Sequence, residues 1–596
     1  MCGIIGILGK TDAVSRVVES LSRLEYRGYD SCGVAALVSK GIERRRAVGK
    51  IVQLQNLLSL DPLESTIAIG HTRWATHGGV TEKNAHPHGN ENVVLVHNGI
   101  IENHNDLKKS LSLKGYVFET DTDTEVVVHL LDDLLKSMTP KAAVQALPKH
   151  LKGAYALVIL FKSTPNMIYG IRQGSPLAVG YGDGEMYLGS DAIALSNLTQ
   201  KITYLEDGDS AEITHDHVTV WDKLGAIVAR EVKQSNFISG LIGKDGYRHF
   251  MLKEIYEQPR ILGDIFAHYI DFENYTIKTT LNEKPSDINI VACGTSFYAG
   301  LVAKYWLEQM ARIPISVDIA SEFRYRCPPL SKSGVSLFIS QSGETIDTLE
   351  ALKYAREHQK VVGLVNVPES SIVRASHYHY PLLAGPEIGV ASTKAFIAQL
   401  GVLSLFTLSL MDDHTKRKQL IDALIKAPGL INQVLNYEKQ IESLAHKLTH
   451  ATTILYLGRN LSYPIALEGA LKLKELSYIH AEGFAAGEMK HGPIALIDQD
   501  TPVVVVAPHD EVYEKTLSNV QEVIARGAQV ILLSSGEVEP SLKDKLLGHI
   551  QLPEMDAFIS PFVFAVPLQL LAYHVACLKG TDVDQPRNLA KSVTVE

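Results

Sequence analysis

Residues 288–298 read INIVACGTSFY, and residues 453–463, about 165 positions later, read TILYLGRNLSY. Each stretch starts as a short apolar run with β-branched residues, passes through a polar turn that contains Gly, and leads into a helical pattern. A strand, a turn and a helix in that order are typical of a parallel α/β sheet. The similarity of the two stretches predicts that one α/β unit occurs twice in this half of the chain.

The first 230 or so residues have a different pattern. Short β-branched runs at 66–69, 93–96 and 155–161 alternate with turns rich in Gly and Asn, which predicts a sheet-rich α+β domain. Between 235 and 285 the chain is more polar, and residues 247–267 have the pattern of an amphipathic helix that suits a connector. We therefore expect an α+β domain at 1–238, a helical linker at 239–285, α/β units at 286–425 and 426–580, and a tail at 581–596.

Composition narrows the class of protein. The 596 residues exceed what one hydrophobic core usually organises, and 45% hydrophobic with 21% charged residues is typical of a soluble globular protein. The net charge is −10 and the basic residues form no long stripe, which argues against nucleic acid as a partner. Five scattered cysteines without a CxxC pair indicate neither a disulfide framework nor a zinc site, so a reducing compartment fits best.

No segment reads as a membrane or export signal. The start, MCGIIGILGK, has no basic region ahead of its apolar run, and Asp12 follows soon. The most apolar later stretch, residues 395–411, is interrupted by Gln399, Ser404, Thr407 and Ser409 and is shorter than the roughly 20 apolar residues that span a bilayer. We expect a buried core helix there, no membrane partner, and a cytoplasmic protein.

Cys2 is the first candidate for chemistry. Methionine aminopeptidases remove Met1 when a small residue follows, which would leave a cysteine with a thiol and a free α-amine. An α-amine titrates near ~7.7 to 8.0 and can serve as a general base at neutral pH, while the thiolate attacks a carboxamide. The alternative is that Cys2 is a small buried apolar residue that opens a strand.

Three downstream segments could supply what an amide-hydrolysing cysteine needs: HTRWATHG at 71–78, VHNGII at 96–101 and TDTE at 122–125. The side chain of Asn98 and the backbone of Gly99 can donate to an oxyanion. Arg73 suits the α-carboxylate of glutamine, and Asp123 suits its α-ammonium group.

Histidines are frequent in the same region, at positions 71, 77, 86, 88 and 97. Their spacing lies on apparent turns and lacks a matching set of carboxylates, so we interpret them as hydrogen-bonding scaffold rather than metal ligands. No metal and no cofactor is expected.

Four motifs together resemble the class II, N-terminal nucleophile, glutamine amidotransferases: Cys-Gly-Ile at the start, EYRGYDS at 25–31, and the segments 71–78 and 96–101. The resemblance implies a four-layer αββα sandwich. It implies that Cys2 is the nucleophile and its amine the base, that Asn98 and Gly99 form the oxyanion hole, and that Arg27 orders the site. The glutamine-binding residues that it implies are Arg73, Thr76, His77 and Asp123.

The second half must decide what receives the ammonia. It lacks the Ser-Gly-Gly-x-Asp-Ser loop of asparagine synthetases and the acidic pair that opens a phosphoribosyl loop. Instead, hydroxyl-rich turns follow apparent strands at 293–296, 340–345 and 390–394. Such turns present backbone N–H groups and hydroxyls to a phosphate, although one alone would read as a helix cap. Three at the carboxyl ends of one sheet favour a shared crevice.

A predicted helix at 464–479 carries a narrow charged stripe. Glu468, Lys472 and Glu475 are spaced i, i+4, i+7, and apolar residues cover much of the remaining surface. This pattern indicates the wall of a wet cavity, where pKa values shift toward those of acid–base catalysts. His491, on a turn bracketed by Gly487 and Gly492, reads equally as a general acid/base or as a hydrogen-bonded turn residue.

These turns, the stripe and the segment 582–596 resemble the paired sugar isomerase (SIS) domains of the glucosamine-6-phosphate synthase family, which implies two flavodoxin-like parallel sheets. The resemblance covers essentially the whole chain and is weakest at 235–285. It implies that Lys591 forms a Schiff base, that Glu475 moves a proton between C1 and C2 with help from Lys472, and that His491 of a neighbouring subunit opens the sugar ring. The sugar-phosphate residues that it implies are Thr295, Ser296, Ser340, Gln341, Ser342, Thr345, Val390 and Ala391.

The resemblance further implies the reaction: D-fructose 6-phosphate and L-glutamine give D-glucosamine 6-phosphate and L-glutamate, the first step of hexosamine synthesis. It implies a homodimer and an internal ammonia channel with Trp74, Ala590 and Val593, although Trp74 could also be core packing. Two alternatives are a phosphosugar-binding regulator and a glutaminase with a decayed sugar half. The first would not require Cys2 with its oxyanion donors, and the second would lack Glu475 and Lys591.

Overall fold

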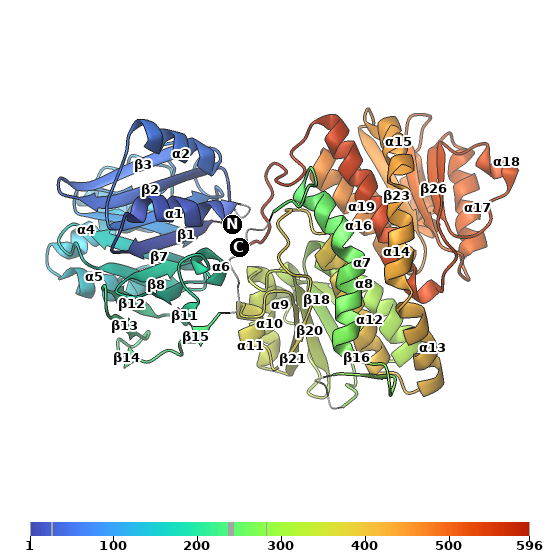
Figure 1. The fold of residues 1–596 in the computed structure, drawn as a ribbon, viewed down its shortest axis with the longest axis horizontal. Coiled ribbons are helices and arrows are strands. Elements are labelled where there is room, and N and C mark those ends of the chain that lie inside the picture. Colours follow the sequence, from blue (N-terminus) through green and yellow to red (C-terminus); the bar gives the residue numbers. More distant parts are fainter. Residues whose placement is uncertain (1, 26–27, 236–242, 280, 282, 595–596) are drawn as a thin grey trace. The chain divides into compact units, whose positions relative to one another are not determined.

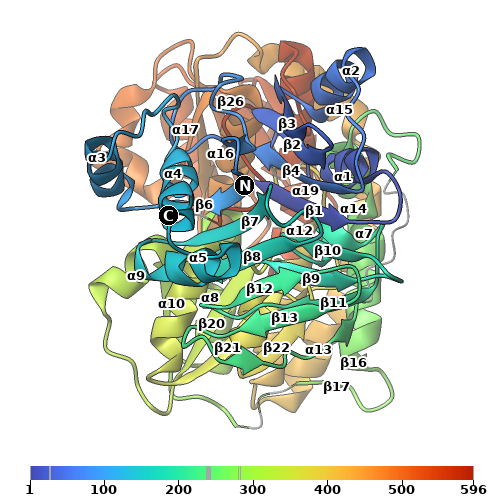
Figure 2. The ribbon, with the colours of Figure 1, turned by 90° about the vertical axis from the view of Figure 1, so that its left-hand side faces the viewer.

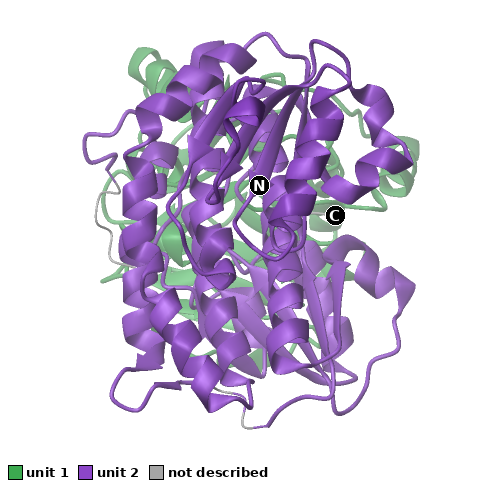
Figure 3. Cartoon of the chain, turned by 90° about the vertical axis from the view of Figure 1, so that its right-hand side faces the viewer, with its two compact units in different colours: residues 1–241, 592–596 green, residues 242–591 purple. Residues whose placement is uncertain are grey.

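The computed structural model describes residues 2–25, 28–235, 243–279, 281 and 283–594. The chain divides into two compact units (Figure 3). Unit 1 comprises residues 1–241 with 592–596, and unit 2 comprises residues 242–591. Two predicted features, Met1 and Arg27, lie outside the described residues.

Unit 1 contains two antiparallel sheets, one of eight strands and one of seven. Figure 2 looks onto this unit, with β7, β8, β12 and β13 running side by side. The larger sheet has the order β15 (Lys233–Gln234), β11 (Lys201–Tyr204), β9 (Ala178–Tyr181), β10 (Met186–Gly189), β1 (Gly3–Leu8), β4 (Ile67–Arg73), β2 (Ser31–Val38), β3 (Gly41–Val48). The smaller has the order β14 (Ile227–Val228), β13 (Val218–Trp221), β12 (Ser210–Ile213), β8 (Ile168–Gln173), β7 (Tyr155–Phe161), β6 (Val93–Gly99), β5 (His88–Gly89).

Three apolar clusters bind these layers together. The middle cluster joins the two sheets through residues such as Ile69 and Val158, and the outer clusters join each sheet to helices through residues such as Val17 and Leu131. Both sheets are therefore covered, which confirms the predicted αββα sandwich. The helices are α1 (Ala13–Ser22), α2 (Ile51–Leu60) and α6 (Ala192–Leu195) on one side, and α3 (His104–Leu113), α4 (Glu125–Leu135) and α5 (Pro140–Ala146) on the other.

Unit 2 contains two five-stranded parallel sheets with the same strand order, 2-1-3-4-5. This is the flavodoxin-like order, so the predicted fold class and the repeat are confirmed. The first sheet comprises β19 (Ile315–Ile319), β18 (Ile288–Ala292), β20 (Val335–Ser340), β21 (Lys360–Val365) and β22 (Tyr378–Pro381). The second comprises β24 (His480–Ala485), β23 (Thr453–Gly458), β25 (Pro502–Ala507), β26 (Gln529–Ser534) and β27 (Gly548–Gln551).

Helices between and around these sheets form one large apolar core (Figure 1). Those that contribute most are α7 (Phe250–Tyr269), α8 (Gly294–Trp306), α12 (Lys394–Ser409), α14 (Ala427–Leu435), α16 (Ser462–Ser477) and α19 (Ser560–Lys579). The remaining α-helices are α9 (Ala320–Arg326), α10 (Ile346–Arg356), α11 (Ser371–Ala375), α13 (His414–Leu424), α15 (Glu438–Leu448), α17 (Tyr513–Ile524) and α18 (Pro540–Lys543). Because α7 packs its apolar face into this core, it is an integral part of unit 2, and the short hairpin β16 (Ile270–Asp271) and β17 (Thr276–Ile277) follows it.

Two apolar helices are relevant to whether the chain contains a membrane-spanning segment. The stretch expected to be a buried core helix is α12, whose residues 394–408 are all buried, as predicted. A longer apolar helix was not predicted from the sequence: among the described residues, only Ala557–Lys579 is long and apolar enough to cross a bilayer. Its apolar window is 89% buried within the protein, so packing against α15 and α16 accounts for its composition.

Candidate active sites

Strand register in unit 1 brings the glutaminase candidates together. Gly3 pairs with Thr72, so Cys2 lies beside the end of β4, and Asn98 and Gly99 end β6 in the opposing sheet. One cavity is lined by Cys2, Arg73, Trp74, Thr76, His77, His86, His97, Gly99 and residues 122–124. Apart from Arg27, which lies outside the described residues, the glutamine-site residues inferred from the sequence border this cavity or, like Asn98, contact a residue that does.

The Cys2 thiol is held against Trp74. The backbone N–H of Trp74 donates to the Cys2 sulfur at 3.3 Å, and the thiol lies 3.5 Å from the Trp74 carbonyl. Burial raises the pKa of the Cys2 thiol, and Arg73 opposes that shift in part. The thiol therefore stays protonated near neutrality, so its use as a nucleophile needs a base that removes the proton.

Asn98 presents its amide donors toward Cys2, and Gly99 borders the same cavity. The Asn98 side-chain amide donates to the Cys2 carbonyl oxygen and to the Ser190 hydroxyl, at 3.3 Å each. Gly99 has φ of +119°, and a Cβ there would lie 2.0 Å from the Ala154 carbonyl oxygen. Only glycine fits this position, which leaves the backbone of the strand end free to approach a substrate.

The side chains expected to bind glutamine already make hydrogen bonds to other parts of the protein. The Arg73 guanidinium donates to the carbonyls of His77 at 2.6 Å and Gly78 at 3.1 Å, and Asp123 accepts the backbone N–H of Ile101 at 2.8 Å. Arg73 thus shapes the 77–79 turn whether or not it also binds a carboxylate.

The histidines in this region form a stacked and buried group. The rings of His71 and His86 are stacked with centroids 4.2 Å apart, and His88 meets His86 edge-on at 4.5 Å. Burial lowers the pKa of His71, His86, His88 and His97, so all four are neutral at pH 7. In the part of the chain that the structure describes, no group of His, Cys, Asp and Glu side chains is arranged to hold a metal ion.

In unit 2 two of the three hydroxyl-rich turns follow adjacent strands of one sheet. The third, residues 390–394, was wrongly predicted to follow a strand: it begins nine residues after β22 ends at Pro381, and it leads into α12. Residues 293–296 follow β18 and residues 340–345 follow β20, and these strands are neighbours at the switch point of the strand order. The Ser340 hydroxyl accepts the backbone N–H of Gly343 at 3.0 Å and lies 3.2 Å from the Thr345 hydroxyl. Ligands of this fold bind at such a point, so the predicted crevice has the expected position.

The predicted charged stripe lies on α16, but Glu468 and Lys472 are almost fully buried rather than exposed on the wall of a wet cavity as expected. The stripe forms a network that reaches Thr295 in the turn at 293–296. The Lys472 ammonium lies 2.7 Å from Glu475 and 3.5 Å from Glu468, and it donates to the Thr295 hydroxyl at 3.0 Å. Burial acts to lower the pKa of Lys472, but Glu468 and Glu475 outweigh it and raise that pKa. Burial raises the pKa of Glu468 to about 8, and the nearby Lys472 opposes that shift in part.

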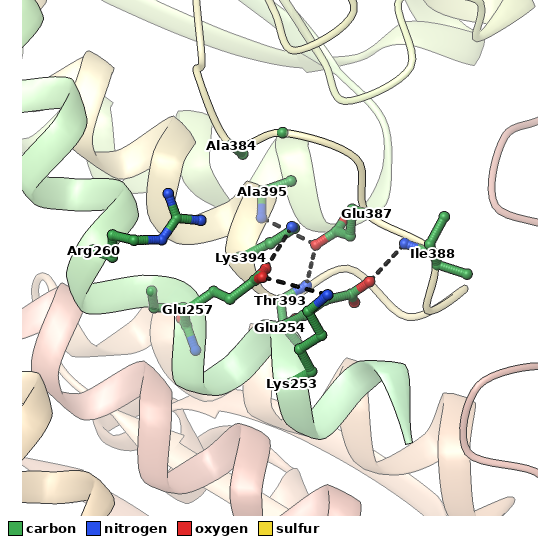
Figure 4. Close-up of polar contacts among 12 residues, drawn as sticks. Lys253, Glu254, Glu257, Arg260, Ala384, Glu387, Ile388, Thr393, Lys394 and Ala395 are labelled. Atoms are coloured by element: carbon green, nitrogen blue, oxygen red, sulfur yellow. Dashed lines mark hydrogen bonds and ion pairs between the residues drawn. The ribbon is translucent and has the colours of Figure 1, made fainter. Parts of the chain in front are cut away.

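Lys591 lies in a cage that the sequence analysis did not anticipate. Its ammonium group donates to the carboxylate of Glu387 and, at 2.8 Å, to the carbonyl of Gly389. Glu387 is itself buried and accepts the backbone N–H groups of Thr393 at 2.9 Å and Ala395 at 3.0 Å (Figure 4). The carboxylate thus fixes both the lysine and the turn that leads into α12.

A second buried carboxyl group stands behind this turn. Glu254 of α7 accepts the backbone N–H groups of Ile388 at 2.6 Å and Gly389 at 3.1 Å (Figure 4). Burial, with Glu387 close by, raises the pKa of Glu254 to about 8, whereas the ion pair with Lys591 outweighs burial at Glu387 and lowers its pKa. The two buried carboxyl groups of the cage therefore differ: the surroundings of Glu254 favour its neutral form and those of Glu387 favour its charged form.

Comparisons with known proteins agree with this division. Residues 71–197 match a glutamine amidotransferase domain, and residues 281–409 and 447–579 each match a SIS domain. Along its full length the chain is 53% identical to a glutamine–fructose-6-phosphate aminotransferase (isomerizing) of Bradyrhizobium diazoefficiens and 52% identical to one of Brucella suis, with 100% of both chains covered in each case. The chain belongs to the glutamine–fructose-6-phosphate aminotransferase family.

A solved structure supports the same assignment for unit 2. The C-terminal domain of the glucosamine-fructose-6-phosphate aminotransferase from Francisella tularensis matches with a TM-score of 0.55 and 43% identity. It covers 58% of this chain and all of its own.

The residues implied for subunit contact and for the ammonia channel are placed differently: Trp74 borders the Cys2 cavity, whereas no contact with a site residue is described for His491. His491 is exposed at the end of a short 3-10 turn, Ala486–His491. Trp74 and Val593 belong to unit 1 and Ala590 to unit 2, so the channel remains a prediction for this member of the aminotransferase family.

Glu387 and Glu254 are the functional candidates that the sequence analysis missed. Glu387 stands three residues before Val390, and its one sequence signal is a carboxylate beside a hydroxyl-rich turn. Glu254 lies on α7, about 130 residues away, and only tertiary packing brings it to the turn. Nothing in its local sequence distinguishes it from a solvent-facing glutamate.

Proposed function

We propose that this chain converts D-fructose 6-phosphate and L-glutamine into D-glucosamine 6-phosphate and L-glutamate, as an isomerising aminotransferase. The proposal is carried by full-length similarity to aminotransferases of that name, combined with a cysteine site in unit 1 and, in unit 2, hydroxyl-rich turns and a buried Lys591 paired with Glu387. The product is an amino sugar phosphate, which fits a first step in hexosamine synthesis.

In unit 1, the Cys2 thiolate attacks the side-chain carbonyl of glutamine after the α-amine of Cys2, freed by removal of Met1, takes the thiol proton. The Asn98 amide and the Gly99 backbone stabilise the oxyanion. The amine then returns the proton to the leaving nitrogen, ammonia departs, and water hydrolyses the thioester to glutamate. The raised pKa of the Cys2 thiol supports a mechanism with such a base.

In unit 2, the hydroxyls of Ser296, Ser340, Ser342 and Thr345, with Gln341, hold the phosphate, and Thr295, Val390 and Ala391 border the sugar. Once the Lys591 ammonium group has passed a proton to Glu387, the free amine forms an imine with C2 and releases water, and ammonia then replaces the lysine at that carbon. Glu475 then carries a proton from C1 to C2, with Lys472 beside it. The network of α16 supports this role because it keeps a carboxylate and an ammonium group 2.7 Å apart near the Thr295 turn.

Further parts of the proposal concern the transfer of ammonia between the two sites and the assembly of two subunits. Ammonia passes through an enclosed route with Trp74, Ala590 and Val593, because ammonium in neutral water has no lone pair for attack on carbon. The enzyme acts as a cytoplasmic homodimer, in which an exposed His491 reaches the sugar site of the neighbouring subunit. Neither nucleic acid nor a membrane is a partner.

The first test separates glutamine hydrolysis from the sugar chemistry. The variant Cys2→Ala should release no glutamate from glutamine, while the interconversion of fructose 6-phosphate and glucose 6-phosphate continues at the parent rate. Mass spectrometry of the active parent should find Cys2 at its N-terminus. An active enzyme that retains Met1 would contradict the amine-base mechanism.

The second test addresses proton transfer in the sugar half. The variant Glu475→Gln should reduce glucosamine 6-phosphate formation by at least about 100-fold, as expected for removal of a general base, and should keep glutamate release. A phosphosugar-binding regulator would make no amino sugar in either form, so formation of product by the parent also decides between these two functions.

A further inference from the structure

His71, which the proposed mechanism does not use, contacts the oxyanion residue directly. It lies on β4 with its side chain fully buried, and its Nε2 atom is 2.9 Å from the His97 carbonyl oxygen and 3.1 Å from the Asn98 side-chain oxygen. The ring of His86 stacks on His71 at 4.2 Å. His71 therefore stands behind Asn98, on the side away from Cys2.

The chemistry of these partners fixes the tautomer of His71. A backbone carbonyl can only accept a hydrogen bond, so the Nε2 atom that faces the His97 carbonyl must carry the proton. The Asn98 atom that faces the same N–H must then be an acceptor, which is the amide oxygen and not the nitrogen. This assignment follows from the carbonyl of His97 alone and does not depend on how the Asn98 amide is oriented beforehand.

The orientation of Asn98 has a consequence for the reaction. With its oxygen turned to His71, its NH₂ group faces Cys2 and Ser190. A rotation of 180° would turn the amide oxygen toward the Cys2 carbonyl and place two donors, the Asn98 NH₂ and the His71 N–H, against each other. Two hydrogen bonds would be lost and an oxyanion would meet an acceptor instead of a donor.

We infer that His71 is a positioning residue for glutamine hydrolysis: its Nε2–H locks the Asn98 side chain with the amide donors toward Cys2. This inference deepens the proposed function and rests on it, because it assigns a role in the same oxyanion site. His71 does not itself exchange protons with substrate.

The surroundings of His71 keep it in the required form. The pKa of His71 is lowered to about 3, chiefly by burial; the hydrogen bonds to the His97 carbonyl and Asn98 oppose this shift, and the nearby His97 and Arg73 side chains add to it. The other ring nitrogen, Nδ1, has no hydrogen-bond partner among the described residues. His71 thus remains a neutral Nε2–H donor across the range in which the enzyme works.

The test compares three variants of the full chain by glutamate release. His71→Phe removes the donor and should lower kcat about 100-fold, the loss seen when an oxyanion donor is removed, with KM for glutamine within about threefold of the parent. His71→Gln places an amide N–H near the position of Nε2 and should recover at least about tenfold of that loss. Circular dichroism and the thermal midpoint establish that each variant is folded.

The matched control is His88→Phe. His88 is equally buried in the same group, but it contacts His86 and Thr122 rather than Asn98. Its kcat should stay within about threefold of the parent. Equal losses in His71→Phe and His88→Phe would mean a general packing defect and would overturn the inference, as would an unchanged kcat in His71→Phe.

A second measurement stands apart from activity and from the proposed function. Nitrogen-15 spectra of the histidine-labelled parent should show the His71 proton on Nε2 and none on Nδ1, with the signal assigned by its loss in His71→Gln. A proton on Nδ1 would overturn the inference even if the enzyme hydrolyses glutamine. If Cys2→Ala still released glutamate, the proposed mechanism would fail while the tautomer result stood.

Discussion

At the scale of single residues, both candidate sites depend on charges that are neutralised inside the protein. Lys591 is useful to a Schiff-base mechanism only if it is held in place, and Glu387 holds it by an ion pair in which both side chains are almost completely buried. Removing one partner of such a pair leaves the other as an uncompensated buried charge. The two residues should therefore behave as one functional unit.

This pairing gives the first prediction. In Glu387→Gln the amide oxygen can still accept from Thr393 and Ala395, but the negative charge facing Lys591 is gone. Glucosamine 6-phosphate formation should fall by at least about tenfold, on the basis of ~1.4 kcal/mol or more for a lost charge-assisted hydrogen bond, while glutamate release remains. Glu257→Gln is the control, because Glu257 pairs with Lys394 in the same region. Equal losses in both variants would contradict a specific role for Glu387.

At the scale of elements, the buried histidines on and near β4, β5 and β6 reduce the stability of folded unit 1 at low pH. In the folded protein burial lowers the pKa of His71, His86, His88 and His97, to about 3 for His71 and His88. Below pH ~6.5 the unfolded chain binds protons that the folded unit excludes. The free energy of unfolding of unit 1 is therefore at its full value above pH ~6.5 and falls as the pH drops toward 3.

The second prediction follows from this fall in the free energy of unfolding at low pH. Each of these histidines lowers the free energy of unfolding by up to about 1.4 kcal/mol per pH unit below ~6.5. Urea unfolding between pH 7 and 5 can be followed by fluorescence in a Trp306→Phe background, because the remaining tryptophans, Trp74 and Trp221, both lie in unit 1. His88→Gln removes one titrating group and should make the pH slope shallower by about that amount. An unchanged slope would contradict the buried neutral state of His88.

The C-terminal tail caps the N-terminus of α7 through Asp584, a residue far from α7 in the sequence. The carboxylate of Asp584 accepts the backbone N–H groups of Phe250 and Met251 at 3.0 Å each, and the Asp584 carbonyl accepts the N–H of Val390 at the same distance. A carboxylate at a helix N-terminus also interacts favourably with the helix dipole. One residue of the tail thus anchors both the helix and the turn beside Lys591.

The third prediction concerns that anchor. Asp584→Ala should destabilise the folded protein by about 1 kcal/mol, the usual cost of a lost N-cap, and should increase hydrogen–deuterium exchange at residues 581–591. Asp584→Asn keeps an acceptor and should lose less. Exchange in the tail that is the same in Asp584→Ala as in the parent would show that the cap does not hold it.

The sequence predicted these elements to very different degrees. The run 155–161 matches β7 to the residue, because a central strand buried on both faces is apolar throughout. The stripe on α16 was readable because its spacing is set within one helix. The contacts of Glu254, Glu387 and Asp584 join residues far apart in the chain, and no local pattern encodes which polar groups end up buried together.

At the scale of the whole molecule, the chemistry divides as the chain does. The network of α16, the hydroxyl-rich turns and the Glu387–Lys591 pair all lie within residues 242–591, where one large apolar core and two smaller apolar clusters hold the unit together. Cys2, Asn98 and the buried histidines all lie within unit 1. Each reaction should therefore have the groups that it needs in one unit, with ammonia as the shared intermediate.

The last prediction tests this division directly. A fragment of residues 243–596 should fold alone, because it contains the whole core of unit 2 and because a solved C-terminal domain from Francisella tularensis aligns over 58% of this chain. It should interconvert fructose 6-phosphate and glucose 6-phosphate without glutamine, and it should release no glutamate. Glu475→Gln within the fragment is the control that must abolish the interconversion. A folded fragment without isomerase activity would mean that the sugar site requires groups from unit 1, because in that case burial and charge pairing inside unit 2 would be insufficient for catalysis.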